Sequence, residues 1–499
     1  MNKLLIGILT IHMLAYTAGN LSAQNTIYVN ASATGANNGT SWANAYESFQ
    51  TALDNASLGD EIWVARGIYK PSSDYGLGGG SRYWHFRLIE GVQIYGGFAG
   101  TETAVSQRVN FGAGEANETI LSGDLSSNDD FDVSNGGYQG TTGDDNCYHV
   151  LYHPDGSNLT HASILDGFTI TGGNANGATD PHNKAGGLYL YSSWPRIYNV
   201  IFQHNQATDL GGAAYMYDIG SEFTNVSFIE NTSGGGGATY LSYGGVIFSN
   251  AIFTGNVSTG DGGALSTHSS HPALNNTLFS SNTAGNNGGA IIFYSNSVEI
   301  NVDLNNVTFS DNQAGGSGGA IRFASNNTAS ELFINNCIVW GNTAATSGNE
   351  LSLVSAGTTT LNYSCYKNQA NDVEVLNGTL TATNNNISLF PVFVDPASND
   401  FRIGGFSPCK DSGKNDYNGM ATDLRGEARI QNTTIDMGAY EWTNGIDPQI
   451  NGENVLYVNI NASGVGNGAS WADAYTSFQT ALDNSISGCD IWIAKGTYI

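Results

Sequence analysis

The sequence predicts an all-β protein, a single-stranded right-handed parallel β-helix (solenoid) with an N-terminal capping α-helix. Three observations support this fold class. A motif of Asn, Phe, Asn and a Gly pair recurs every 25 to 30 residues, short apolar runs follow each motif, and an aromatic segment with helical spacing precedes the repeats. Repeats of this length without helical periodicity are typical of solenoids, and crossovers between parallel strands are almost always right-handed.

The first half of the motif predicts a buried strand. It reads NVIFQHN in the first copy and NVTFSDN in the fifth, and alternation along a strand places the residue after the Asn on the same face as the Phe. Recurrence of an aromatic residue at one position marks that face as the inner one. We therefore expect a column of stacked rings formed by Phe202, Phe228, Phe253, Phe279 and Phe309, with Val339 in the sixth copy.

The polar residues of the motif predict corners between strands. An Asn tolerates left-handed backbone angles and can bond its side chain to the neighbouring coil, and Gly supplies positive φ at the other corner. Ligand binding by these asparagines is the alternative, but a residue needed at every coil marks no single site. The expected ladder contains Asn205, Asn231, Asn256, Asn282 and Asn312.

A second apolar run follows each Gly pair, for example AIRF after Gly318–Gly319. We expect Ile321 and Phe323 to point inward there, because the opposite parity would bury Arg322 without a partner.

The N-terminal part predicts an export signal and then a cap. Residues 1–24 carry a lysine, an apolar stretch and small residues, the pattern of a signal peptide. In residues 25–70, Trp42, Tyr46, Phe49 and Leu53 have helical spacing behind Ser41, and GDEIWVARGIY reads as the first strand. A helix there would cover the open end of the solenoid, although the same aromatic stripe could serve as a sugar platform.

The spacing of the repeats divides the rest of the chain into segments. We expect early coils with long loops in residues 71–185, regular coils in 186–385 and a closing segment in 386–445. Residues 457–498 align without gaps to residues 28–69, with 26 of 42 positions identical. Residues 446–499 therefore predict the start of a second, truncated repeat unit, which indicates a piece of a longer tandem protein.

Composition excludes several classes of function. The 499 residues contain 16 Lys and Arg against 43 Asp and Glu, so the protein repels nucleic acid and anionic lipid. After the leader, no segment is long and apolar enough to span a membrane. Five widely spaced cysteines form no disulfide framework, and Cys337 and Cys365, about one coil apart, predict at most a stacked pair of buried thiols.

If the protein is an enzyme, its site is expected in the loops of residues 66–145. Within residues 186–350 the only basic side chains, Arg196 and Arg322, are about five coils apart, too far to share one sugar. The loops offer Arg87, Asp129 and Asp130 as candidate catalytic residues. Basic residues are denser in these loops, at Arg66, Lys70, Arg82, Arg87 and Arg108.

The same loops contain the one candidate metal site. Asp124, Asp129, Asp130 and Asp132 could bind calcium, although their spacing does not match an EF-hand and a plain solvated acidic loop is the alternative. Asp144 and Asp145 follow in a Gly-rich stretch. Zinc is not expected, because His85, His161, His182 and His204 are scattered and His149 lies too far along its strand from His153.

Two families resemble the chain. The GGA(I/L) and FxxN pairing of residues 186–345 resembles the repeat of the chlamydial polymorphic outer membrane proteins, which implies a surface-exposed adhesin with a β-helix of the pectin-lyase-like superfamily. GVQIYGGFAGTETAVSQR (residues 91–108), SPCKDSG and DMGAYE resemble large secreted β-helix proteins of Gram-negative bacteria, whose activity is mostly unassigned. The resemblance implies location more than chemistry.

Together these features predict a secreted or cell-surface stalk or adhesin-like protein of a Gram-negative bacterium. Its polar flank would bind extracellular glycans or surface proteins, with no catalysis in the regular coils. The alternatives are a polysaccharide lyase or glycoside hydrolase using residues 66–145, and a spacer without a ligand. Apart from calcium, no cofactor is expected.

Overall fold

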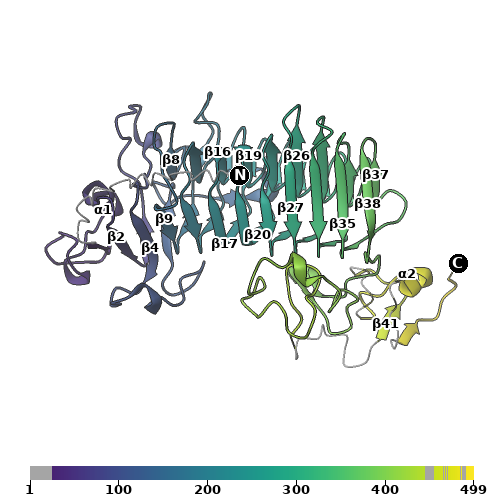
Figure 1. The fold of residues 1–499 in the computed structure, drawn as a ribbon. Coiled ribbons are helices and arrows are strands. Elements are labelled where there is room, and N and C mark those ends of the chain that lie inside the picture. Colours follow the sequence, from purple (N-terminus) through teal and green to yellow (C-terminus); the bar gives the residue numbers. More distant parts are fainter. Residues whose placement is uncertain are drawn as a thin grey trace, which may run out of the picture.

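The computed structural model describes residues 25–443, 455–464, 466, 468, 470–483, 485 and 490–498. Within these residues the chain winds into a right-handed parallel β-helix, which confirms the predicted fold class (Figure 1). The expected signal peptide, residues 1–24, lies outside the described residues. No helix in the described part of the chain is both long enough and apolar enough to cross a bilayer.

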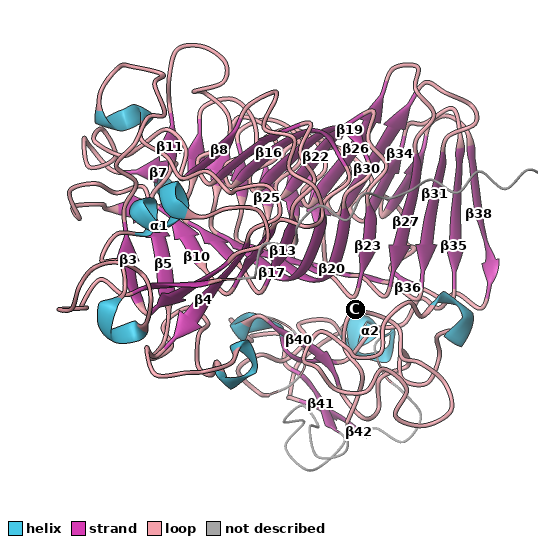
Figure 2. Cartoon of the chain, turned by 60° about the vertical axis from the view of Figure 1, so that its left-hand side comes forward, coloured by secondary structure: helices cyan, strands magenta, loops and turns pink. Residues whose placement is uncertain are grey.

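Each coil passes through parallel sheets in which a strand pairs with its equivalents in the coils before and after (Figure 2). The nine-stranded sheet contains β8 (Leu151–His153), β12 (Leu188–Tyr191), β16 (Ala214–Ile219), β19 (Thr239–Gly244), β22 (Leu265–His268), β26 (Ile291–Ser295), β30 (Ile321–Ser325), β34 (Leu351–Leu353) and β37 (Val373–Val375). The seven-stranded sheet contains β11 (Asn174–Ala175), β15 (Gln206–Ala207), β18 (Thr232–Ser233), β21 (Val257–Ser258), β25 (Thr283–Ala284), β29 (Gln313–Ala314) and β33 (Thr343–Ala344).

The remaining face is a 20-stranded sheet made of two stacks that share β17 and β20. The first stack contains β1 (Thr26–Val29), β2 (Glu61–Ala65), β4 (Gln93–Phe98), β9 (Ile164–Asp166), β13 (Arg196–Tyr198), β17 (Glu222–Ile229), β20 (Ile247–Thr254), β23 (Ala273–Asn275), β27 (Asn301–Asn305), β31 (Glu331–Asn335), β35 (Thr358–Asn362) and β38 (Thr379–Asn384). The second adds β3 (Gly67–Tyr69), β5 (Thr119–Ser122), β10 (Thr169–Thr171), β14 (Ile201–Gln203), β24 (Leu278–Ser280), β28 (Thr308–Ser310), β32 (Ile338–Val339) and β36 (Cys365–Tyr366).

The positions with left-handed backbone angles at the corners differ in part from those that the sequence predicts. The first Asn of each motif, from Asn199 to Asn336, is left-handed, with φ between 47° and 56°. The second Asn is not left-handed; instead the residue before it is, as at Glu230 and Asp311. The first Gly of most pairs has positive φ, but the second is needed for space, because a Cβ on Gly263 would lie 2.0 Å from the carbonyl oxygen of Gly289 in the next coil.

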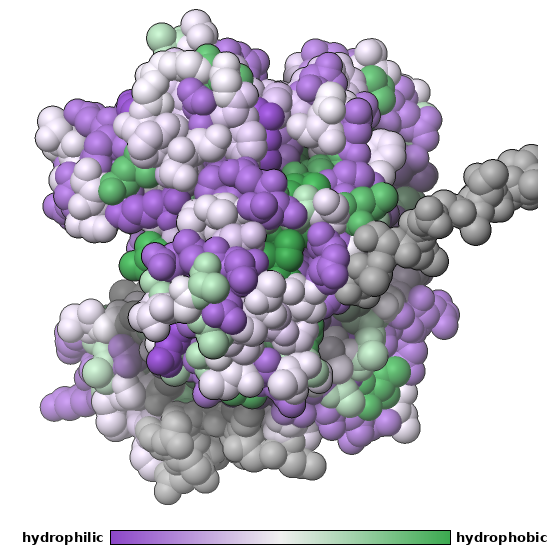
Figure 3. Space-filling model, turned by 90° about the vertical axis from the view of Figure 1, so that its left-hand side faces the viewer, coloured by the Kyte–Doolittle hydropathy of each residue, from purple (hydrophilic) through white to green (hydrophobic). Residues whose placement is uncertain are grey.

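The expected N-terminal helix is wrong in its extent. Two short helices replace it: η1 (Trp42–Asn44), capped by Ser41, and α1 (Phe49–Asn55), capped by Ser48. The buried Phe49 ring packs on Phe86 at 5.0 Å and on Phe168 at 6.1 Å, so α1 does cover the open end of the solenoid. Figure 3 shows this end of the molecule, where the described surface is largely hydrophilic or near neutral.

Smaller elements fill the connections. They are η2 (Ser81–Tyr83), η3 (Val105–Gln107), the hairpin of β6 (Phe131–Asp132) and β7 (Gly137–Tyr138), η4 (Val133–Asn135), the hairpin of β39 (Phe393–Asp395) and β40 (Asp400–Ile403), η5 (Pro396–Ser398) and η6 (Asn415–Tyr417). In the second unit, β41 (Val455–Val458) pairs with β42 (Asp490–Ile493) in the register of β1 with β2, and α2 (Phe478–Asp483) stands at the place of α1.

Asn386 and Ile387 still pair with the coil of Ser364 and Cys365, and the chain up to residue 443 then runs along one side of the solenoid (Figures 1 and 2). Residues of this segment cover outward side chains of the second stack, including Leu278 and Ile338, with Phe393, Phe401 and Met437. They also bond to the left-handed asparagines, because Asn276 Nδ2 donates to the carbonyl of Thr422 and Asn336 Nδ2 donates to that of Lys414.

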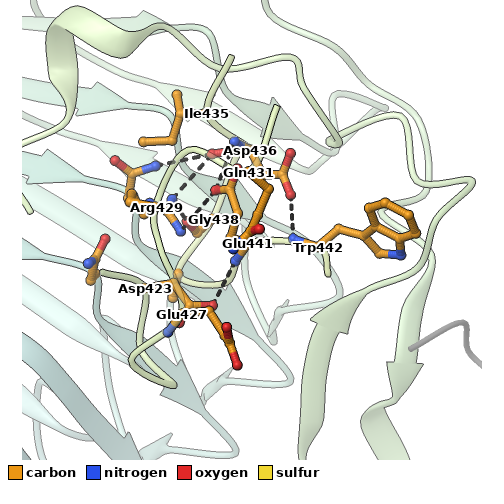
Figure 4. A network of polar contacts seen from close by, with 12 residues as sticks. Asp423, Glu427, Arg429, Gln431, Ile435, Asp436, Gly438, Glu441 and Trp442 are labelled. Carbon is orange, nitrogen blue, oxygen red and sulfur yellow. Dashed lines mark hydrogen bonds and ion pairs between the residues drawn. The ribbon is translucent and has the colours of Figure 1, made fainter. Parts of the chain in front are cut away.

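A buried charged network holds this segment together (Figure 4). Arg429 is 1% exposed; its Nη2 donates to the carbonyl oxygens of Asp436 and Gly438, and its Nη1 lies 3.7 Å from Glu441 Oε2. Burial raises the pKa of Asp436 to about 6 and that of Glu441 to about 8. The DMGAYE stretch therefore supplies the partners of one buried guanidinium, which is a structural role.

Candidate binding surface

The ladder asparagines lie inside the solenoid and bond to one another. Asn231 Nδ2 donates 3.0 Å to Asn256 Oδ1, and Asn256 Nδ2 donates 2.9 Å to Asn282 Oδ1. Each oxygen also accepts the backbone N–H of the preceding Asn, and each Nδ2 donates to a carbonyl further back, such as that of Phe202. All six asparagines of the series, from Asn205 to Asn342, are buried, so none is free to bind a ligand.

The motif phenylalanines form one stacked column beside this ladder. Centroids of successive rings lie 5.0, 4.6, 4.6 and 5.0 Å apart from Phe202 to Phe309, with interplanar angles of at most 9°. All five rings are 0% exposed. The arrangement stabilises the core and offers no surface.

The four aspartates of the acidic loop do not converge on a point. Asp124 accepts backbone N–H groups of its own turn, from Ser126 and Ser127, and Asp132 caps η4 through Ser134. Asp130 is exposed, whereas Asp129 accepts a 3.0 Å bond from Asn146 Nδ2. In the described residues no three His, Cys, Asp or Glu side chains gather as a metal site.

Partial burial affects the carboxyl group of Asp129. Burial, with Asp124 and Asp145 nearby, raises the pKa of its carboxyl to about 7, against the opposing effects of Asn146 and Lys70. Among the described residues, no hydrogen bond or ion pair joins Arg87 to Asp129 or Asp130, so the structure does not assemble the three candidate catalytic residues.

Arg87 belongs instead to a cluster of histidine and tyrosine side chains at the start of the nine-stranded sheet. Its Nε donates 3.0 Å to His85 Nε2, and its guanidinium lies 4.4 Å from the Tyr75 ring centre. His149 Nε2 lies 3.2 Å from His182 Nδ1, with Tyr152 stacked on His149 at 4.8 Å. Of the histidines that look scattered in the sequence, His85 and His182 thus come together with His149, because the three are on neighbouring coils. His161 instead bonds to the carbonyl of Gly220, and His204 pairs with Glu230.

Burial sets the chemistry of this cluster. It lowers the pKa of His85 to about 4, and the pKa of His149 and of His153 to about 3, so these imidazoles stay neutral at physiological pH. Two other basic side chains of the loops already have partners. Arg82 donates to the carbonyls of Asn146 and Asn174, and Arg108 forms an ion pair with Asp166 at 2.9 Å.

The outer face of the nine-stranded sheet carries aromatic side chains on consecutive coils. We call Tyr191, Tyr217, Tyr243, His268 and Tyr294 the tyrosine strip. Ring centroids of successive members lie 4.4, 5.6, 5.9 and 5.6 Å apart, so the strip is continuous from β12 to β26. Tyr243 is 39% exposed and Tyr294 38%. Trp194, also exposed, lies near the start of the strip, where its Nε1 donates to the carbonyl of Asp218.

A second, more buried column runs next to the strip. Tyr152, Tyr189 and Tyr215 form it, with Tyr240 at its end and ring centroids 5.1 to 5.7 Å apart. The strip itself lies in an acidic setting, since partial burial, Tyr217, Asp155 and Asp218 together raise the pKa of Tyr191. Sequence reasoning missed this surface because LYLY and AAYMY look like core, although alternation places Leu188 and Leu190 inward and the tyrosines outward.

The buried cysteines also differ from expectation. Cys365 pairs in register with Ile338, so it faces outward, and Cys337 faces the core; the two thiols do not stack. Cys365 lies instead in the apolar cluster with Cys409 of the closing segment.

Comparison with known proteins bears on the repeat and the fold. The family model of the Chlamydia polymorphic membrane protein repeat matches residues 250–268, 276–298 and 306–324. These coils are similar to that repeat. Among solved structures, the crystal structure of pectate lyase Pel9A is similar with a TM-score of 0.50 at 15% identity, covering 85% of this chain and 98% of that one. No curated protein sequence matches the chain.

Proposed function

We propose that the protein is a surface-displayed β-helical binding module of a Gram-negative bacterium, adhesin-like in role, whose tyrosine strip binds glycans. The family with the similar repeat is named for membrane proteins, which supports a location at the outer membrane surface. The single observation that carries the binding proposal is the unbroken aromatic strip on the outer face of β12 to β26.

The chemistry of the strip favours a neutral glycan. Tyr191 and Tyr217, like His268 and Tyr294, stack on each other, so the strip turns ring edges and polar tips outward, which suit the C–H and hydroxyl groups of a sugar chain. Coils rise by about 4.8 Å, close to the length of one sugar residue, so successive rings are spaced to meet successive residues of an extended chain. Asp155 and Asp218 beside Tyr191, and a net charge of −27, oppose binding of acidic polysaccharides.

A glycan array with the purified protein tests this proposal. We expect binding to extended neutral oligosaccharides, weakened at least about tenfold, or roughly 1.4 kcal/mol, by Tyr217→Ala or Tyr243→Ala. Tyr198→Ala, which removes a tyrosine from the first stack, should leave binding unchanged. Absence of glycan binding, with binding to host or neighbouring surface proteins instead, would contradict the glycan assignment; absence of any ligand would indicate a spacer.

A carbohydrate-active enzyme is the second candidate. The observation in its favour is the cluster of Arg87, His85 and Tyr75 in the loops where a site was expected. Incubation with pectin, alginate and glycosaminoglycans should then produce unsaturated uronate absorbance that Arg87→Ala abolishes. Absorbance that also disappears in Asp129→Ala would extend the site to the acidic loop, and no absorbance on any substrate would exclude a lyase acting on them.

A further inference from the structure

The loop of residues 124–146 folds against the seven-stranded sheet and encloses oxygen atoms that have no partner. Buried side-chain oxygens without any hydrogen bond occur at Asp129 (Oδ1), Asp145 (Oδ2), Asn146 (Oδ1) and Asn174 (Oδ1). Asn146 is 0% exposed and Asn174 3%. A buried acceptor that lacks a donor costs about 1–3 kcal/mol, so four in one region, two of them on carboxyl groups, favour a partner that is a donor or a cation.

Short contacts tie three of the four residues to one place, and the fourth, Asp145, precedes Asn146 in the chain and acts electrostatically on Asp129. Asn146 Nδ2 donates 3.0 Å to the second oxygen of Asp129, which sets the amide oxygen of Asn146 beside that carboxylate. Asn174 donates from its backbone to the carbonyl of Cys147 at 2.9 Å and from Nδ2 to that of Gly143 at 2.8 Å. Asn174 therefore brackets the Asp145–Asn146 pair from both sides.

The nearby protein cations are engaged elsewhere. Arg82 donates to the backbone carbonyls of Asn146 and Asn174, at 2.9 and 3.0 Å, and thereby fixes the two amide residues next to each other. Lys70 is close enough to act electrostatically on Asp129, but its Nζ donates 2.7 Å to Ser127 Oγ. None of these donors reaches the four oxygens.

We propose that Asp129, Asp145, Asn146 and Asn174 bind one divalent cation of the calcium class. Two carboxylates and two amide oxygens form a hard, all-oxygen donor set, which calcium prefers and zinc does not. Of the four aspartates that the sequence suggests, only Asp129 belongs to this set. Asp124 accepts hydrogen bonds within its own turn, Asp130 is exposed to solvent, and Asp132 caps η4. A bound ion would fasten the loop of residues 124–146 to the solenoid.

Metal analysis and calcium titration of the full chain test the proposal. After treatment with a chelator, we expect added Ca²⁺ to raise the melting temperature and Tb³⁺ to luminesce through Tyr138, whose ring packs on Gly143. Asp129→Asn and Asp145→Asn should each weaken Ca²⁺ binding by about tenfold or more. Asp144→Asn changes the same charge one residue away, on an exposed side chain, and should bind as the unmodified protein does.

Three results would overturn the site. They are no stabilisation of the chelated wild-type chain by Ca²⁺, equal loss of binding in Asp144→Asn and Asp145→Asn, or an unchanged Ca²⁺ affinity in Asp129→Asn. Circular dichroism of each variant without calcium separates loss of the site from loss of the fold. A variant that fails to fold is replaced by Asn146→Ala, which keeps both carboxylates and should still weaken binding.

Discussion

Asn342 Nδ2 donates a 2.6 Å hydrogen bond to Oε2 of Glu350, so the interior asparagine ladder ends on a buried carboxyl group. Glu350 also accepts the N–H of Gly341 at 2.9 Å. It follows Gly348 and Asn349 at the place where earlier coils have an Ala, such as Ala320. Glu350 thus replaces the amide oxygen that a further Asn would supply.

This ladder end should make stability depend on pH. Burial raises the pKa of Glu350 to about 8 from an ordinary 4.5. The folded state then binds a proton that the unfolded state releases, so this contribution to stability is complete below about pH 4.5 and is lost as the pH rises to about 8. We expect the urea midpoint of the wild-type chain to fall between pH 5 and pH 8.

Glu350→Gln is the matched variant for this effect. Its amide oxygen can accept from Asn342 without titrating, so the difference in midpoint between variant and wild type should grow in favour of the variant as the pH rises. Other titrating groups are common to both chains and cancel. A difference that stays constant from pH 5 to pH 8 would show that Glu350 does not titrate in this range.

Removing one rung of the ladder should destabilise the solenoid. Asn256→Ala takes the acceptor from the backbone N–H and Nδ2 of Asn231, and the donor from the carbonyl of Phe228. With about 1–3 kcal/mol for each buried group left unpaired, we expect a loss of at least 2 kcal/mol in the free energy of unfolding. Asn225→Gly, which keeps a positive φ at an exposed corner, should lose less than about 1 kcal/mol.

Glycines at two different corners of the coil should respond differently to substitution. Gly263→Ala places a Cβ 2.0 Å from the carbonyl oxygen of Gly289, which forces two coils apart and should destabilise the fold by several kcal/mol. Gly255→Asp should be tolerated, because Asp311 occupies the equivalent left-handed position in another coil. Thermal unfolding of both variants checks this contrast, and equal melting temperatures would contradict it.

The sequence predicts the regular coils well because their signals are periodic. Recurrence at 25 to 30 residues identifies Phe253 and Asn256 as coil positions without knowledge of any contact. The cap was harder to predict, since Trp42 and Tyr46 have helical spacing but lie before a helix that starts at Phe49. Helical spacing over so short a segment does not distinguish one helix from two turns.

The candidate sites were less predictable because they depend on contacts between coils. Tyr191 and Tyr217 become neighbours through the parallel register of β12 and β16, which places an apolar run of the sequence on the outside. His149 and His182 meet for a similar reason, although 33 residues separate them. Asp129 contacts Asn146 only because the loop of residues 124–146 folds back on itself. This loop is not part of the repeat, so the periodicity of the sequence does not predict the contact.

The buried guanidinium of Arg429 should be needed to keep residues 386–443 attached to the solenoid. Arg429→Leu leaves the carboxyl group of Glu441 and the backbone carbonyl oxygens of Asp436 and Gly438 without their guanidinium partner, and each buried acceptor left unpaired costs about 1–3 kcal/mol. We expect the segment to become sensitive to proteases while the coils stay protected. Lys414→Met removes an exposed pair with Asp416 in the same segment and should change nothing measurable. Protease resistance in Arg429→Leu equal to that of Lys414→Met would mean that apolar contacts such as those of Phe401 and Met437 hold the segment by themselves.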